Sequence, residues 1–410
     1  MSSSMSSSPP PHRIQFHVDP IFHNEIARLP WRVPISEWHK YGVRPLNIHR
    51  GISRHVVIFV RAGRFTFGIK EISEEISKKE ISNYEKLLLR GIHTLIPVGY
   101  VVREEEPVAV RTPVGVHYQA GNISHTITLL VEKVLPDSQL YARGFSFDNR
   151  KRIWDAIAEL FVELHTNGVY WGDASLANTL IRFEKVDEPF VGKKTTLKAY
   201  LADAETVEFR PSVSKAMREA ELNFFFESME WMNEDLRAAG STRDELATAN
   251  DQQYLRGRYS MLSAVEEKKK EFERLTSYNI DRFLGQIHNP SYVDLFMKHI
   301  EEHKWYLGER SSAPVSLKEA AHDWYEYMYK PVCELFRREE IVDLFPGKTA
   351  AELYIEIMTN KYFLSEKIGK DVGMIQAMHD YAEKFGVTNS FLEKMKSASD
   401  KLLSIFTSKR

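Results

Sequence analysis

The feature that most constrains this chain lies in residues 169–182, where Asp173 stands five residues before Asn178. A helical pattern precedes this stretch, and a short apolar strand follows it. A second apolar strand ends on Asp203, about 25 residues after Asn178. Phosphoryl transfer uses groups of these kinds: one carboxylate that accepts a hydroxyl proton, then an amide and a second carboxylate that hold Mg²⁺. The spacing alone is common, but its context predicts a phosphoryl-transfer site.

The composition predicts an ordinary globular protein of a reducing compartment. Hydrophobic residues make up 43% and charged residues 27%, and the formal net charge is −2, so neither nucleic acid nor an anionic membrane is indicated as a partner. Cys333 is the single cysteine, which excludes an intrachain disulfide bond and a cysteine-rich zinc site. No apolar run approaches the roughly 20 residues of a transmembrane helix. We expect a cytoplasmic protein whose residues 1–20 form a disordered tail.

Residues 21–135 are expected to form a β-rich lobe. Residues 16–47, which lead into this lobe, are rich in Pro, Trp and His, and we expect an extended arm whose Trp side chains pack against a sheet rather than bind a ligand. The patterns that follow predict, in order, strands at 55–60 and 65–70, a helix at 72–90, a strand at 95–102, loops or a short hairpin at 103–125, and a strand at 126–134.

One strand of this lobe carries a lysine close to a glycine. The run Phe65-Thr66-Phe67-Gly68-Ile69-Lys70 alternates strictly, so Gly68 and Lys70 share one face of the sheet. The small glycine leaves room above this face for a flat ligand. A lysine that extends its ammonium group into solvent is the alternative interpretation.

After residue 135 the pattern becomes helical. Residues 149–166 have an amphipathic pattern that ends at Asn167-Gly168. His165 near its end is interpreted as a packed core histidine rather than a catalyst. Residues 184–194 are polar, and we expect an exposed hairpin loop there.

The two remaining regions are the expected catalytic core of a lower lobe, residues 136–210, and a helical region, residues 211–410, that completes or caps this lobe. Pro331 is expected to kink or split its helix. Segments with helical period are 214–239, 243–276, 292–307, 317–338, 350–359, 374–385 and 390–406.

The order of these features resembles the protein-kinase-like superfamily. The match is carried by the strand lysine, by Trp171-Gly172-Asp173-Ala174-Ser175-Leu176-Ala177-Asn178 and by the strand that ends on Asp203. It is nearest to the small-molecule and lipopolysaccharide-kinase branches, which have Gly-Asp where protein kinases have Arg-Asp. This resemblance implies an α+β, bilobal protein-kinase-like fold with an all-helical C-terminal extension.

From about residue 29 to residue 385 the chain also resembles a bacterial family described as domain of unknown function 4032. The motifs that carry this resemblance are Leu29-Pro30-Trp31, Arg50-Gly51-Ile52-Ser53-Arg54-His55, residues 171–180, Asp203-Ala204-Glu205-Thr206, Asp323-Trp324-Tyr325 and Phe345-Pro346-Gly347-Lys348-Thr349.

The kinase-like resemblance implies that the first lobe binds ATP. Lys70 would contact the α- and β-phosphates as a point charge. Glu85, or else Glu80, would be the helix carboxylate that orients this lysine. The backbone from Glu132 to Leu135 would frame the adenine.

The same resemblance implies that the second lobe supplies the base and the metal ligands. Asp173 would act as general base or orient the acceptor hydroxyl, and Asn178 with Asp203 would hold Mg²⁺ through oxygen atoms. Glu205 follows Asp203 by two residues. It would be a further metal ligand or lie behind the ligands, and a helix cap or a salt bridge is the structural alternative.

The turn that would cover the phosphates departs from the protein-kinase pattern, since residues 50–55 contain a single glycine, Gly51. Positive charge from Arg50, Arg54 and His55 would replace backbone contacts to phosphate. In the alternative interpretation these three residues pair with carboxylates of the N-terminal arm.

Two further departures follow in the second lobe. Trp171 stands where protein kinases have a histidine before the catalytic Asp, and an indole cannot accept a hydrogen bond. No Ala-Pro-Glu motif follows Asp203, so a peptide substrate is not indicated.

We therefore expect a Mg²⁺/ATP-dependent phosphotransferase that acts on a hydroxyl of a small molecule, a sugar or a lipid-linked substrate. The alternative is a catalytically inactive nucleotide-binding module whose helical half binds a partner protein. Retention of the lysine, both Asp residues and the Asn favours the enzyme, and the atypical phosphate turn favours the module. Relatives of this fold also transfer nucleotidyl groups.

Overall fold

The computed structural model describes residues 13–46, 55–104, 108–112, 115–119, 122–130, 134–136, 147–190, 192–238, 248–310, 314–345 and 347–387. The chain divides into two compact units. Unit 1 consists of Met1–Arg182 and Lys198–Gln252, and unit 2 consists of Phe183–Leu197 and Gln253–Arg410.

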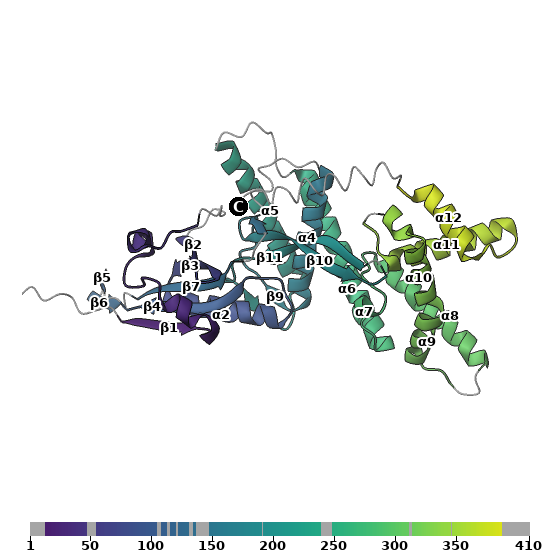
Figure 1. The fold of residues 1–410 in the computed structure, drawn as a ribbon, viewed down its shortest axis with the longest axis horizontal. Coiled ribbons are helices and arrows are strands. Elements are labelled where there is room, and N and C mark those ends of the chain that lie inside the picture. The colour runs from purple at the N-terminus through teal and green to yellow at the C-terminus, as the bar shows by residue number, and fades with distance from the viewer. Residues whose placement is uncertain are drawn as a thin grey trace, which may run out of the picture. The chain divides into compact units, whose positions relative to one another are not determined.

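Unit 1 contains a five-stranded antiparallel sheet with the strand order β1-β4-β7-β3-β2 (Figure 1). Its strands are β1 (Ile14–Val18), β2 (Val57–Ala62), β3 (Phe65–Ile72), β4 (Ile96–Arg103) and β7 (Ile123–Leu129). The expected hairpin is confirmed as β2 and β3. Lys70 lies on an interior strand, opposite Val57 of β2 and Thr126 of β7.

Strand β1 corrects the expected disordered tail, which was placed as far as residue 20. Ile14, Phe16 and Val18 alternate with polar residues, and this period allows the segment to pair with β4 as an edge strand. The N-terminal lobe therefore begins before residue 21. Two strands between β4 and β7, β5 (Val108–Thr112) and β6 (Gly115–Gln119), form a short hairpin, one of the two alternatives expected for residues 103–125.

The N-terminal arm covers one face of the sheet. It is helical rather than extended, with η1 (Pro20–Phe22), α1 (His23–Ala27) and η2 (Ile35–Tyr41). Trp31 and Trp38 are 3% and 0% exposed and pack in one core with Phe67, Ile69 and Ile127 of the sheet. The expectation that these indoles are buried against the sheet is confirmed.

Helix α2 (Glu74–Leu89) packs on β4 and β7 (Figure 1). Ser73 caps its N-terminus by accepting a hydrogen bond from the Ile76 N–H. A hydrogen bond of 2.8 Å joins Ser77 of the helix to Ser124 of β7 and fixes the helix on the sheet. The buried face of α2 is therefore the face toward β4 and β7.

The remainder of unit 1 is built around α4 (Phe147–Thr166) and α5 (Lys215–Ala238), so α5 does not belong to the C-terminal helical unit. Two short strands, β9 (Val169–Tyr170) and β12 (Glu208–Phe209), pair between them. Gly168, which ends α4 as expected, has φ +69°, and a Cβ there would lie 2.1 Å from the carbonyl oxygen of Arg210. Only glycine fits this turn.

A long hairpin follows the Asp–x₄–Asn motif. It consists of β10 (Thr179–Glu188) and β11 (Gly192–Leu201), and β10 also pairs with β8 (Val134–Pro136). The expected loop at 184–194 is therefore mostly strand. Its polarity reflects exposed positions along a strand, such as Lys185 and Asp187, rather than a loop.

Unit 2 contains the C-terminal helices around a core of large aromatic side chains. Its described helices are α6 (Ala249–Thr276, whose first residues belong to unit 1), α7 (Ile280–Phe283), α8 (Pro290–Arg310), α9 (Leu317–Trp324), η3 (Tyr325–Tyr329), α10 (Lys330–Arg338), η4 (Ile341–Leu344), α11 (Ala350–Ile368) and α12 (Gly373–Phe385). Phe296, Trp324, Tyr329 and Tyr354 lie at its centre, with ring centroids 5.0–5.9 Å apart.

The expected break at Pro331 is confirmed. A π-helical turn, η3, separates α9 from α10 and directly precedes the first turn of α10, where Pro331 lies. Proline lacks the N–H group for an internal helical hydrogen bond, and the wider turn accommodates its ring. The predicted helix at 390–406 lies outside the described residues. Among the described helices, none combines the length and the apolar character that a membrane crossing requires.

Candidate active site

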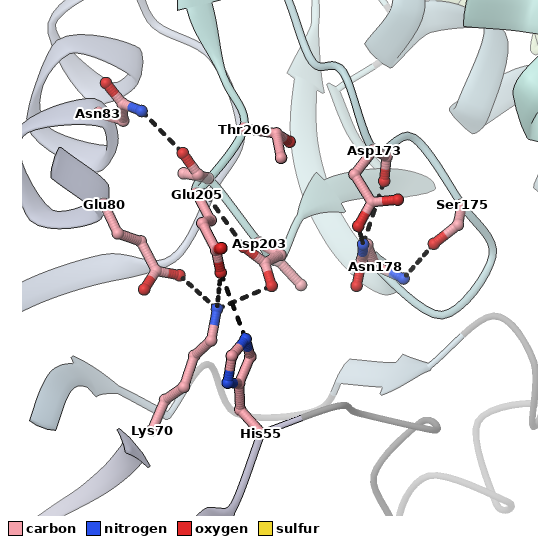
Figure 2. A network of polar contacts seen from close by, with 12 residues as sticks. His55, Lys70, Glu80, Asn83, Asp173, Ser175, Asn178, Asp203, Glu205 and Thr206 are labelled. Carbon is pink, nitrogen blue, oxygen red and sulfur yellow. Dashed lines mark hydrogen bonds and ion pairs between the residues drawn. The ribbon is translucent and has the colours of Figure 1, made fainter. Parts of the chain in front are cut away.

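The centre of the site is Lys70 on β3, whose side chain is only 14% exposed. Three carboxylates converge on its ammonium group (Figure 2). The Nζ atom lies 3.2 Å from Glu80 on α2, 2.9 Å from Asp203 and 3.4 Å from Glu205. The structure thus joins a strand lysine, a helix carboxylate and the Asp203 turn, which lie up to 135 residues apart in the sequence.

The helix partner of Lys70 is Glu80, and the preference for Glu85 was wrong. Glu80 is 1% exposed, whereas Glu85 is exposed. The physical reason is helical phase: Ser77, Glu80 and Tyr84 recur at three- and four-residue spacing and share the buried face of α2. Residue 85 is five positions after Glu80 and therefore lies on another face of the helix.

The electrostatics of this group show an excess of negative charge. Burial alone would lower the pKa of Lys70, but the charges of Glu80, Asp203 and Glu205 raise it above its ordinary value. Burial, and then the charge of Asp203, raise the pKa of Glu80 to about 7 although Lys70 acts in the opposite direction. Because one ammonium group is shared among three carboxylates, it does not compensate for the burial of Glu80.

Asp173 and Asn178 form a second pair beside this group (Figure 2). The Asn178 amide donates to the backbone oxygen of Asp173 at 3.1 Å and to its carboxylate at 3.2 Å. The backbone N–H of Asn178 donates to the Ser175 hydroxyl at 3.3 Å, and its carbonyl accepts from the Ala202 N–H at 2.9 Å. This last bond ties the Asp–x₄–Asn loop to the residue that precedes Asp203.

A residue that the sequence interpretation missed, Glu221 of α5, holds the loop before Asp173. Its carboxylate accepts the backbone N–H groups of Trp171 at 2.7 Å and Gly172 at 2.8 Å, and it pairs with His165 at 2.7 Å. Glu221 and His165 are 1% and 2% exposed, so the interpretation of His165 as a core histidine is confirmed. The sequence signal that could have identified Glu221 is an acidic residue on the apolar face of a predicted helix.

Trp171 connects the loop before Asp173 to the backbone of Asp203, a contact that the sequence did not suggest. Its indole N–H donates to the backbone oxygen of Asp203 at 2.9 Å, and its own carbonyl accepts the Thr206 hydroxyl at 2.7 Å. An indole cannot accept a hydrogen bond, but at this position it acts as the donor to the Asp203 carbonyl oxygen. Gly172 has φ +84°, and a Cβ there would lie 3.1 Å from the Thr206 carbonyl oxygen.

Helix α2 also fixes the turn that carries Asp203 and Glu205. The Asn83 amide donates to the carbonyl oxygens of Ala204 at 2.8 Å and Val207 at 3.2 Å. The Tyr84 hydroxyl donates to the carbonyl of Ala202 at 2.7 Å. Consequently the helix that supplies the lysine partner also positions both acidic side chains of the turn.

Several predicted binding residues lie outside the described part of the chain, namely Arg50, Gly51, Arg54 and Glu132. Leu135 belongs to β8, whose backbone pairs with Ile181 of β10. His55 is described: its Nε2 atom lies 3.5 Å from the Glu205 carboxylate. One carboxylate partner of His55 is therefore in the Asp203 turn.

The donor atoms at this site fit Mg²⁺ bound together with phosphate. Within the described ranges, no group of three or more His, Cys, Asp or Glu side chains could hold a metal ion by itself. Proteins usually bind Mg²⁺ through one or two carboxylates completed by water and substrate phosphates. Asp203, Glu205 and the amide of Asn178 are oxygen donors of this type, and the surplus negative charge around Lys70 favours a cation.

The solved structures that are similar to this chain at low identity include the three described here, and the search of curated proteins found no match. WaaP in complex with acyl carrier protein has 14% identity and a TM-score of 0.36, with 60% of this chain and 88% of that chain covered. An aminoglycoside-3'-phosphotransferase of type VIII has 14% identity and a TM-score of 0.31, with 58% and 98% covered. The Rio2 kinase of Chaetomium thermophilum, in an ADP/Mg²⁺-phosphoaspartate complex, has 13% identity and a TM-score of 0.28, with 73% and 76% covered.

The model of one protein family, described as Domain of unknown function (DUF4032), matches residues 312–385. This range contains the Asp323-Trp324-Tyr325 and Phe345-Pro346-Gly347-Lys348-Thr349 motifs. Residues 312–385 thus match the DUF4032 family, and the described part of the chain has an α+β fold, with an antiparallel sheet near its N-terminus and a helical C-terminal region.

Proposed function

We propose that the protein is a Mg²⁺/ATP-dependent phosphotransferase that acts on a hydroxyl of a small molecule, a sugar or a lipid-linked substrate. One observation carries the proposal: Lys70 bridges the helix carboxylate of Glu80 and the carboxylate of Asp203. A lysine held in this way by a helix is the arrangement with which kinases position nucleotide phosphates.

Each site residue has a separate role in the proposed phosphoryl transfer. Lys70 binds phosphate oxygens as a point charge, oriented by Glu80. Asn178 and Asp203 hold Mg²⁺, which neutralises charge on the transferred phosphoryl group when it is bound. Asp173 orients the acceptor hydroxyl and accepts its proton.

The segment after Asp203 favours a small acceptor over a peptide. It lacks the Ala-Pro-Glu motif, and α5 already begins at Lys215. Ala204, Thr206 and Val207 within this segment are bonded to α2 and to the loop before Asp173. A segment tied down in this way offers no free platform for docking a peptide strand.

Labelled ATP tests this proposal directly. The protein is incubated with Mg²⁺, γ-labelled ATP and a panel of hydroxyl acceptors that includes sugars, aminoglycosides and lipid-linked sugars. We expect one class to be labelled, and Asp173→Asn to reduce its labelling by about 10²-fold or more. Asp235→Asn, which changes an exposed carboxylate of α5, is the matched control and should leave labelling unchanged.

A second candidate is a nucleotide-binding module without catalysis, whose helical unit binds a partner protein. Exposed aromatic side chains on unit 2 favour this candidate, because large exposed apolar groups mark interaction surfaces. Those that are at least 59% exposed are Trp305, Tyr306, Tyr327, Tyr362, Phe363 and Phe385. Binding of Mg-ATP without labelling of any acceptor, unchanged in Asp173→Asn, would favour the module over the enzyme.

A further inference from the structure

Glu205 occupies the position where nucleotide phosphates bind under the proposed function. Its Oε2 atom lies 3.4 Å from the Lys70 ammonium group and 3.5 Å from Nε2 of His55 (Figure 2). Lys70 and His55 both belong to the N-terminal half of unit 1, and Glu205 follows β11 in the other half. One carboxylate therefore contacts two nitrogen groups suited to binding phosphate oxygen.

The backbone around Glu205 is held from three directions, so its carboxylate is delivered by a fixed turn. Its own N–H donates to the Asp203 carboxylate at 3.0 Å. The neighbouring Ala204 carbonyl accepts from Asn83 of α2 at 2.8 Å. On the other side, the Thr206 hydroxyl donates to the Trp171 carbonyl at 2.7 Å. The turn thus fixes the backbone position from which the Glu205 side chain reaches Lys70.

The charges at the site give this contact a consequence. Glu80, Asp203 and Glu205 already surround the single ammonium group of Lys70, which is 14% exposed and therefore poorly screened by salt. A bare nucleoside triphosphate adds several negative charges and must displace Glu205 from Lys70. A divalent cation beside Asp203 removes both obstacles, since it attracts the phosphates and offers Glu205 another partner.

We propose that Glu205 makes nucleotide binding depend on the divalent cation: without the cation, its carboxylate occupies Lys70 and His55 and excludes the bare triphosphate. This inference rests on the proposed function and identifies the form of the nucleotide that the site selects. Glu205 acts as a specificity-determining residue, whether or not it also touches the ion.

Binding, rather than turnover, tests the inference. The dissociation constants of ATP and of adenosine are measured by calorimetry, with Mg²⁺ and with excess EDTA, for the full chain and for Glu205→Gln. We expect the variant to bind ATP in EDTA at least about tenfold more tightly than the wild type, because one repelling charge is removed close to the phosphates. Adenosine has no phosphates, so its affinity should not change.

Two further variants separate charge from other effects. Glu205→Asp keeps the charge and should bind ATP in EDTA as weakly as the wild type. Glu208→Gln removes an exposed carboxylate that pairs with Arg210, and it is the control for net charge. Thermal melting of each variant establishes that it is folded before its affinity is compared.

The outcomes distinguish the inference from the function on which it rests. If the wild type binds Mg-ATP but Glu205→Gln binds ATP in EDTA no better than the wild type, the inference is overturned and the proposed function stands. An equal gain in Glu208→Gln, or a gain for adenosine, would also overturn it. If the wild type binds ATP neither with Mg²⁺ nor with EDTA, the proposed function and the inference both fail.

Discussion

Replacing Glu221 should loosen the loop that presents Asp173. Glu221→Ala removes the acceptor for the N–H groups of Trp171 and Gly172 and the partner of His165, all at 2.7–2.8 Å. Leaving the buried Trp171 N–H unpaired costs about 1–3 kcal/mol, leaving the partly buried Gly172 N–H unpaired costs about 1 kcal/mol, and the lost contact to His165 adds about 1 kcal/mol. We therefore expect unit 1 to lose about 3–5 kcal/mol of stability. Glu221→Gln keeps one oxygen for both N–H groups and should cost about 1 kcal/mol.

Hydrogen exchange measured by mass spectrometry resolves this effect locally. In Glu221→Ala, peptides that contain residues 171 and 172 should exchange about 100-fold faster, because about 3 kcal/mol is lost from the free energy of local opening. Peptides of α11 in unit 2 serve as the internal control. Unchanged exchange at residues 171 and 172, together with an unchanged denaturation midpoint, would refute the structural role that we assign to Glu221.

Three other substitutions test separate parts of the site and of unit 2. Glu80→Gln should weaken Mg-ATP binding about tenfold or more by calorimetry because Lys70 loses its buried helix partner, whereas Glu85→Gln should change nothing; equal effects would contradict the assignment of Glu80. Trp171→Phe should cost unit 1 about 1–3 kcal/mol in urea denaturation followed by circular dichroism, since the Asp203 carbonyl loses its donor and a cavity remains; a change within about 0.5 kcal/mol would contradict this. Burial alone would raise the pKa of Glu352, but the hydrogen bond from His288 lowers it below its ordinary value of 4.5. A group with a lowered folded-state pKa stabilises the fold above its unfolded pKa and loses this contribution on acidification. Melting temperatures between about pH 6 and about pH 3 should therefore fall more steeply for the wild type than for Glu352→Gln. Parallel curves of melting temperature against pH would exclude this contribution.

The order of the motifs and their resemblance to the protein-kinase-like superfamily led us to expect Lys70, Asp173, Asn178 and Asp203 at one site. Each of these residues lies at or next to the end of a strand, or on a strand of clear alternation, and strand patterns fix which way a side chain points. Helical phase was less certain from sequence. Both acids at positions 80 and 85 lie in the same charged helix, and only its packing against β4 and β7 decides which of them faces Lys70.

Contacts between distant segments were beyond the reach of sequence patterns. Glu221 bonds to residues about 50 positions away, and no local pattern distinguishes a buried anchoring acid from a surface acid. Sequence patterns also did not predict how the chain divides into two units. The hairpin of β10 and β11 leaves unit 1 after Arg182 and returns at Lys198, with Phe190 packed edge-on against Tyr329 of unit 2. The polar residues along this hairpin led us to expect a loop, so its strands are longer than the sequence predicted.

The affinity of the protein for Mg-ATP tests the central claim most directly. Calorimetry is performed on the wild type, on Lys70→Met and on Lys198→Met, a lysine of unit 1 that is 15% exposed and pairs with Glu159 instead. We predict that the wild type binds Mg-ATP, that Lys70→Met weakens binding at least about tenfold, and that Lys198→Met binds as the wild type does. Absence of binding by the wild type, or equal affinity in Lys70→Met, would contradict a nucleotide site built around Lys70.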